Sequence, residues 1–117
     1  MCGFIGCFSK NTLGQNFSIR KYLEIIGYRG PDSKKIYENE NKTFVIGFNR
    51  LSIIDLSSNA NQPFENDKFI SSSNCEIYNF REIKKQLKEF NFKSETDAEV
   101  FLGGYQKWGN DLFNKLE

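Results

Sequence analysis

Runs of residues typical of β-strands alternate along this chain with runs that have helical spacing, and this alternation constrains the fold more than any other feature. Apolar, β-branched or aromatic runs predict strands at residues 4–8, 43–48, 51–54 and 68–73. Apolar residues at intervals of three or four predict helices at residues 18–26, 80–90 and 96–108. Strands interleaved with helices indicate an α+β or α/β domain.

The predicted helix ends carry recognisable signals. Gly27 and Gly109 each follow a helical run and are expected to end it. Thr96 and Glu99 have the spacing of a capping box, which predicts that the last of these helices opens at Thr96. A further apolar helical face is predicted at residues 112–116.

Composition excludes several classes of function. The chain has 117 residues, a net charge of +1 and no histidine. A near-neutral chain lacks the clustered basic surface expected for nucleic-acid binding, so no nucleic-acid partner is predicted. The absence of histidine removes triads and dyads that use it as the base. No run of 18 apolar residues occurs, so no membrane span is predicted.

The cysteines point to a reducing compartment. Cys2, Cys7 and Cys75 form an odd, sparse set in a chain whose N-terminus does not resemble a secretory signal. Free thiols and a cytoplasmic location are therefore expected. No pair of cysteines has metal-ligand spacing, so no metal site is predicted.

Cys2 is the candidate nucleophile. Initiator methionine is normally removed before a small residue such as cysteine, and removal of Met1 would free the α-amino group of Cys2. An α-amine has an ordinary pKa near 7.7–8.0, so part of it is neutral at physiological pH. A neutral amine can accept the thiol proton, which activates a cysteine without any histidine. The alternative is that Cys2 is an early residue with no catalytic part, and the motif Met-Cys-Gly needs the context of the wider sequence to support catalysis.

A series of motifs in order along the chain resembles the class II glutamine amidotransferase domain of glutamine-hydrolysing asparagine synthetases. The matching segments lie at residues 1–6, 29–32, 50–56, 61–63, 74–80, 97–100 and 105–109. They include Arg-Gly-Pro-Asp at residues 29–32 and Arg-Leu-Ser-Ile-Ile-Asp-Leu at residues 50–56. The resemblance implies an α+β fold of the N-terminal-nucleophile (Ntn) hydrolase type, an α-β-β-α sandwich with Cys2 at the end of a central strand.

The resemblance also implies the extent of the domain. Residues 1–117 correspond to the N-terminal portion of a glutaminase domain, so the sandwich is expected to be incomplete in this chain. The Ser-Gly-Gly-x-Asp-Ser phosphate loop of the synthetase domain is not found in the sequence. The synthetase domain is therefore predicted to be absent. No cofactor is expected here, since ATP and magnesium would belong to that missing domain.

The resemblance assigns roles in hydrolysis of the glutamine side-chain amide. Cys2 would attack the amide and form a glutamyl thioester, releasing ammonia for a synthetase domain or subunit. Asn74 would donate its side-chain amide to the oxyanion, with the backbone N–H of Cys75 as the second donor. Each residue also has an ordinary structural alternative; Asn74, for example, could simply form a turn.

The remaining implied roles concern the two charged groups of the substrate. Arg50 would bind the α-carboxylate of glutamine, for which a planar guanidinium is well suited. Glu76 and Asp97 would accept the α-ammonium group. Arg50 and Glu76 could instead be surface charges, and Asp97 could be an acid near a helix start. The family order of all these residues favours the catalytic interpretation.

Two departures from the family favour an alternative. Cys75 stands where the family has glycine, so a side chain could strain the loop or crowd the thioester. Three serines at residues 71–73 replace an apolar run, which weakens a strand expected to be buried. The alternative function is therefore a catalytically silent fragment or interaction module that retains the fold.

Overall fold

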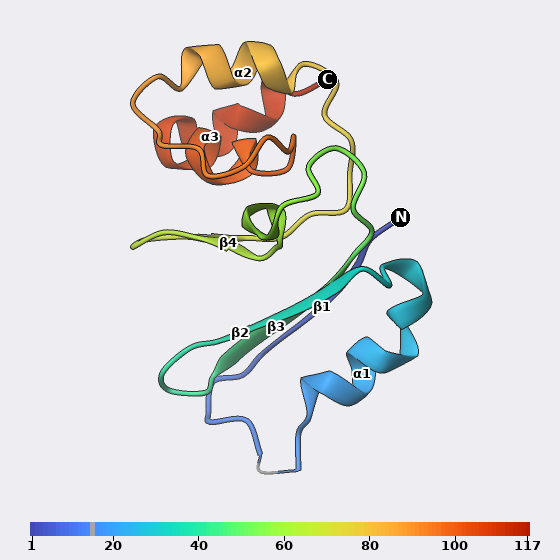
Figure 1. The fold of residues 1–117 in the computed structure, drawn as a ribbon. Helices are drawn as coiled ribbons and strands as arrows, with labels where there is room; N and C mark the ends of the chain where they lie inside the picture. Colours follow the sequence, from blue (N-terminus) through green and yellow to red (C-terminus); the bar gives the residue numbers. More distant parts are fainter. Residues whose placement is uncertain (15) are drawn as a thin grey trace. The chain divides into compact units, whose positions relative to one another are not determined.

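The computed structural model describes residues 1–14 and 16–117, and it divides the chain into two compact units (Figure 1). Unit 1 comprises residues 1–52 and 61–63. Unit 2 comprises residues 53–60 and 64–117. Each unit is described by itself below. Together their elements confirm the predicted α+β class, with antiparallel sheets and short helices.

Unit 1 is built on an antiparallel sheet of strands β1 (Gly3–Phe8), β3 (Phe44–Arg50) and β2 (Ser33–Glu38), in that order. β3 lies in the middle, and six of its seven residues are buried. β1 alternates between more and less buried positions, as an edge strand with one covered face does. Cys2 therefore precedes an edge strand of this sheet, whereas the family resemblance implied a central one.

Helix α1 (Ile19–Ile25) covers one face of this sheet (Figure 1). Leu23 of the helix is fully buried and lies directly over Gly47 of β3. A β-carbon at Gly47 would come within 2.3 Å of the Leu23 side chain, so glycine is what allows this close packing. Asn49 of β3 donates its side-chain amide to the Leu23 carbonyl, which secures the last turn of the helix at 2.6 Å.

Two sequence predictions for the chain before β4 (Phe64–Glu65) need correction. The strand β2 is missed by the sequence because it carries several charges, and its strand character comes from pairing with β3, as in the Ile36–Gly47 pair. The strand expected at residues 51–54 is wrong. Ile53 and Ile54 are 70% and 54% exposed, so their β-branched side chains have no buried face that would favour a strand.

Unit 2 contains a short two-stranded sheet and two helices. The strands are β4 (Phe64–Glu65) and β5 (Ile70–Ser71), which pair antiparallel. The helices are α2 (Phe80–Gln86) and α3 (Val100–Trp108), and a 3-10 helix, η3 (Gly109–Asn114), follows directly. Gly109 has a φ of 56° and ends α3 as predicted, whereas the helical face expected at residues 112–116 belongs largely to η3.

Two predictions in unit 2 are also corrected. The strand at residues 68–73 is reduced to Ile70–Ser71, and the hydroxyls of Ser71 and Ser72 are buried without a hydrogen-bond partner among the described residues. The helix expected to open at Thr96 begins at Val100, and its N-cap is Glu99. The predicted capping box does not form, because the Glu99 carboxylate turns back to residues 93 and 94.

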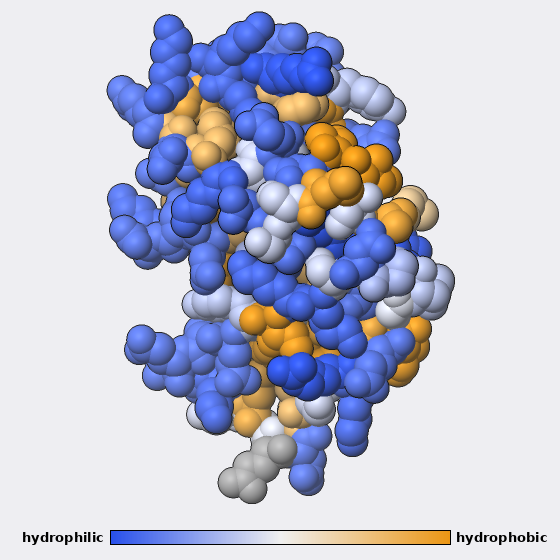
Figure 2. All heavy atoms as spheres, viewed as in Figure 1, coloured by the Kyte–Doolittle hydropathy of each residue, from blue (hydrophilic) through white to orange (hydrophobic). Residues whose placement is uncertain are grey.

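The core of unit 2 lies between its two helices, where Ile83, Leu87 and Val100 are almost fully buried. Several large apolar side chains elsewhere reach the surface, and Figure 2 shows such patches interrupting a largely hydrophilic face. More than half exposed are Phe8, Ile25, Ile53, Ile54, Leu56 and Phe113. Within the described ranges, no helix is long and apolar enough to cross a membrane.

Candidate active site

The Cys2 thiol is held at the start of β1 by the backbone that follows β3. Its Sγ accepts the N–H of Leu51 at 3.3 Å, and the thiol donates to the Leu51 carbonyl at 3.6 Å. Cys2 is half-buried, whereas Met1 before it is 73% exposed. These contacts give the sulfur a defined position in unit 1.

The loop at residues 29–32 connects Cys2 with the end of β3. Arg29 donates from Nε to the Cys2 carbonyl at 3.0 Å. Asp32 accepts the N–H of Ser52 at 2.6 Å and donates its own N–H to the Arg50 carbonyl at 3.0 Å. Between them, Gly30 lies so close to β3 that a β-carbon would come within 2.3 Å of the Asn49 carbonyl oxygen. The loop therefore positions Cys2 and Arg50 by backbone contacts.

Arg50, the predicted ligand of the substrate carboxylate, is only 6% exposed. Its Nη1 donates to Oδ1 of Asn61 at 2.9 Å. The same oxygen accepts the hydroxyl of Ser33 at 2.8 Å. Asn61 thus orients the guanidinium. The sequence marked residues 61–63 as a family motif but assigned no role to Asn61.

The other predicted site residues lie in unit 2, three of them on the segment between β5 and α2 and Asp97 just before α3. Asn74, Cys75 and Glu76 are all exposed. Asp97 is 7% exposed, and its carboxylate accepts the N–H of Ile77 at 2.9 Å and that of Ala98 at 2.9 Å. The structure therefore brings Asp97 to the segment that carries Asn74, Cys75 and Glu76.

The backbone at Cys75 tolerates a side chain. Lys42 is the only non-glycine residue with a positive φ among those the structure describes, so Cys75 is outside the left-handed region that favours glycine. Partial burial of the sulfur raises the pKa of the Cys75 thiol. A hydrogen bond with Ser73 lowers this pKa, and the nearby carboxylates of Asp97 and Glu76 raise it. The thiol is therefore kept neutral beside two acids.

The raised pKa gives a testable prediction about reactivity. Only the thiolate reacts with iodoacetamide, so alkylation of Cys75 at neutral pH should be slower than that of a model thiol, and its rate should still rise above the ordinary cysteine pKa. Peptide mass spectrometry across a pH series measures this rate. In Asp97→Asn, the midpoint of the curve of alkylation rate against pH should move to lower pH, because the substitution removes one carboxylate that raises the pKa of Cys75. A midpoint at or below the ordinary value would contradict the assigned environment.

Residues that the sequence analysis did not assign also hold the Asp97 turn. Asp55 accepts the N–H of Glu95 at 2.8 Å and that of Ser57 at 2.8 Å. Glu99 accepts the N–H groups of Lys93 and Ser94. Both acids lie within motifs that resemble the family, at residues 50–56 and 97–100, and this was the available sequence signal.

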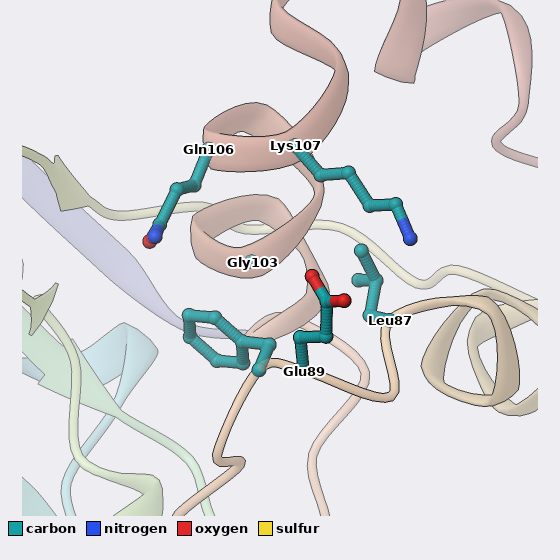
Figure 3. Close-up of a pocket in the computed structure, with 6 residues that line it drawn as sticks. Leu87, Glu89, Gly103, Gln106 and Lys107 are labelled. Carbon is teal, nitrogen blue, oxygen red and sulfur yellow. The ribbon is translucent and has the colours of Figure 1, made fainter.

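A pocket of about 190 Å³ lies elsewhere in unit 2, between α3 and the loop after α2 (Figure 3). Its lining residues are Leu87, Glu89, Phe90, Gly103, Gln106 and Lys107. None of the predicted site residues lines this pocket, so its shape does not identify the reaction centre. In the part of the chain that the structure describes, no cluster of three or more histidine, cysteine or acidic residues could hold a metal ion.

The predicted site residues thus form two local groups. Cys2 and Arg50 lie in unit 1, tied to the loop at residues 29–32. Asn74, Cys75, Glu76 and Asp97 lie in unit 2, tied by the bond from Ile77 to Asp97. The roles that the resemblance implies for these residues remain predictions.

Comparison with known proteins identifies what this chain is similar to. The profile described as "Glutamine amidotransferase domain" matches residues 1–117. An asparagine synthetase (glutamine-hydrolyzing) 1 of Bacillus subtilis is 37% identical over 99% of this chain and 19% of that protein. A protein of the same name from Arabidopsis thaliana is 31% identical over 100% of this chain and 20% of its own length.

A second Bacillus subtilis asparagine synthetase (glutamine-hydrolyzing) is 36% identical over 93% of this chain and 15% of that protein. The chain therefore spans about one fifth or less of the length of these relatives. The profile match, by contrast, extends over every residue of the chain. By its sequence, this chain belongs to the glutamine amidotransferase domain family.

Proposed function

We propose that this chain carries out the glutaminase half-reaction of an asparagine synthetase-like amidotransferase. Glutamine would be hydrolysed at its side-chain amide to glutamate and ammonia. The observation that best supports this proposal is the position of the Cys2 thiol, which is held at the chain start by the backbone of Leu51 while Arg29 holds the Cys2 carbonyl. A thiol fixed beside a future α-amine is what an N-terminal nucleophile requires.

The proposed reaction begins after Met1 is removed. The free α-amine of Cys2 accepts the thiol proton, and the sulfur attacks the amide carbon of glutamine. The carbon–nitrogen bond then breaks, ammonia leaves with the proton returned by the amine, and a thioester remains. Water, deprotonated by the same amine, hydrolyses the thioester to glutamate and restores the thiol. The 73% exposure of Met1 supports its access to a processing enzyme.

The charged ends of the substrate have candidate partners. The Arg50 guanidinium, oriented by Asn61, would bind the α-carboxylate. Asp97 and Glu76 would bind the α-ammonium group. The Asn74 amide and the Cys75 N–H would stabilise the oxyanion, and the absence of a positive φ at Cys75 supports the second of these donors.

The destination of the ammonia is also part of the proposal. A synthetase domain or subunit would receive it, in line with the printed names of the relatives. ATP and magnesium would act there, and we propose no cofactor for residues 1–117, the N-terminal portion of a glutaminase domain. We also propose a cytoplasmic location, because the free thiols of Cys2, Cys7 and Cys75 suit a reducing compartment.

The test is glutamate formation from glutamine by the purified 117-residue chain, together with mass analysis of its N-terminus. Glutamate release by a chain that has lost Met1 supports the proposal. A folded chain that has lost Met1 and releases no glutamate favours the silent interaction module instead.

Replacement of Arg50 by lysine tests the carboxylate site. Lysine keeps the charge but loses the planar fork and the bond to Asn61, so the KM for glutamine should rise about 10–100-fold, the equivalent of one or two charged hydrogen bonds. The kcat should change little, because the carboxylate is bound equally in the ground and transition states. Steady-state kinetics measure both. An unchanged KM would remove Arg50 from the substrate site.

A further inference from the structure

Glu99 is a buried acid to which the proposed mechanism gives no role. Its side chain is 2% exposed, and its carboxylate accepts three hydrogen bonds from one short turn. The donors are the N–H of Lys93 at 2.9 Å, the N–H of Ser94 at 2.8 Å and the hydroxyl of Ser94 at 2.6 Å. A buried carboxylate with this many donors is a strong local anchor, since hydrogen bonds to charged groups are among the strongest in proteins.

The turn held by Glu99 leads directly to Asp97. Ser94 is 5% exposed, and its hydroxyl lies 3.3 Å from that of Thr96, the residue before Asp97. On the other side of Asp97, Glu99 is the N-cap of α3. The Glu99 carboxylate therefore closes a loop from the helix start back to residue 93. Asp97 lies inside this loop, and its carboxylate reaches Ile77 on the segment that carries Asn74 and Glu76.

We propose that Glu99 is a positioning residue for the α-ammonium site. Its carboxylate fixes the turn before Asp97 and so holds the Asp97 carboxylate against the N–H of Ile77. The contact between Asp97 and segment 74–77 then depends on a side chain whose own hydrogen bonds go to Lys93 and Ser94. This inference rests on the proposed function for the role given to Asp97.

Glu99→Gln is the informative variant, because it keeps the size of the side chain. One carboxylate oxygen becomes an NH₂ group, which cannot accept the N–H groups of Lys93 or Ser94. Ser94→Ala is a second variant that leaves Glu99 in place and removes the 2.6 Å hydroxyl bond to it, together with the contacts of that hydroxyl to the hydroxyl and the N–H of Thr96. Glu89→Gln is the matched control, because it makes the same chemical change at an exposed glutamate of unit 2.

Amide hydrogen exchange of Ile77 in the full chain provides a test that does not need activity. In Glu99→Gln the Ile77 amide should exchange about tenfold or more faster, while the Leu87 amide, which bonds Ile83 in α2, should keep its rate. Unchanged exchange at Ile77 would overturn the proposal. Equal acceleration at Ile77 and Leu87 would also overturn it, since Glu99 would then support the whole unit. If Glu99→Gln does not fold, the exchange rates of the Ile77 and Leu87 amides are measured in Ser94→Ala instead, and the same results would overturn the proposal.

Steady-state kinetics then distinguish a role of Glu99 in positioning Asp97 from a role in supporting the whole of unit 2. The KM for glutamine should rise about tenfold in Glu99→Gln and stay constant in Glu89→Gln. With glutaramate, which lacks the α-amino group, Glu99→Gln and the unmodified chain should have the same KM. An equal rise for both substrates would overturn the proposal. An unmodified chain without glutaminase activity would contradict the proposed function alone, and the exchange of Ile77 would still decide the role of Glu99.

Discussion

Replacing Cys2 with alanine is expected to abolish glutamate release, by on the order of 10⁴-fold or more, because removal of a nucleophile eliminates the covalent route. The fold should survive, since Cys2 lies before β1, its thiol bonds only Leu51 among the residues that the structure describes, and the bond from Arg29 to its main-chain carbonyl does not need the thiol. Release of glutamate from glutamine, measured alongside circular dichroism, checks both statements.

Cys7→Ala is the matched control for this substitution. Cys7 is the other thiol of the N-terminal segment, but its side chain packs with the core beneath α1. Its replacement should lower stability slightly and leave the specific activity of the folded chain unchanged. The same small effect for Cys2→Ala would show that the reaction does not use the N-terminal thiol. Equal loss of activity in both variants would trace the loss to the fold.

Replacing Gly30 with alanine is expected to destabilise unit 1 by about 3 kcal/mol, at the upper end of the cost of overpacking. The added β-carbon would come within 2.3 Å of the Asn49 carbonyl oxygen and 2.6 Å of the Arg50 nitrogen. These are main-chain atoms of the central strand, so they cannot rotate away as a side chain could. Urea unfolding followed by circular dichroism measures the change.

The substitution at Gly30 should also displace the candidate site residues. Gly30 lies between Arg29, which holds the Cys2 carbonyl, and Asp32, which holds Ser52. Displacement of this loop should therefore reduce glutaminase activity even in the folded fraction. Gly27→Ala is the control, since a β-carbon there meets nothing within 4 Å and should change stability by less than about 0.5 kcal/mol. Equal stability of the two variants would contradict the close approach of the loop to β3.

The elements that the sequence predicted well are those with local signals. β1, β3 and α2 carry their own apolar patterns, and Gly109 ends α3 as a glycine with positive φ should. β2 could not be found in this way, because its charged residues form a strand only through pairing with β3. The supposed strand at residues 51–54 shows the converse, since β-branched residues without a buried face do not form one.

The candidate site also has residues that the sequence could predict and residues that it could not. Cys2, Arg50, Asn74, Glu76 and Asp97 could be named from motifs, because each residue type matches the chemistry it would perform. The residues that hold them could not. Asn61 orients Arg50, and Arg29 holds the Cys2 carbonyl. Such contacts join segments far apart in the chain, and no spacing rule predicts them.

The amino-acid sequence by itself determined the family and named the candidate residues for its chemistry. The motif order identifies the amidotransferase domain, and in a chain without histidine the α-amine of Cys2 is the base that the sequence predicts. Only the tertiary structure decided how Glu99 is used: a predicted capping residue became the buried anchor of the Asp97 turn. The physical reason is that a carboxylate, once buried, binds the donors that the fold brings to it, whereas local spacing indicates only the donors nearest in sequence.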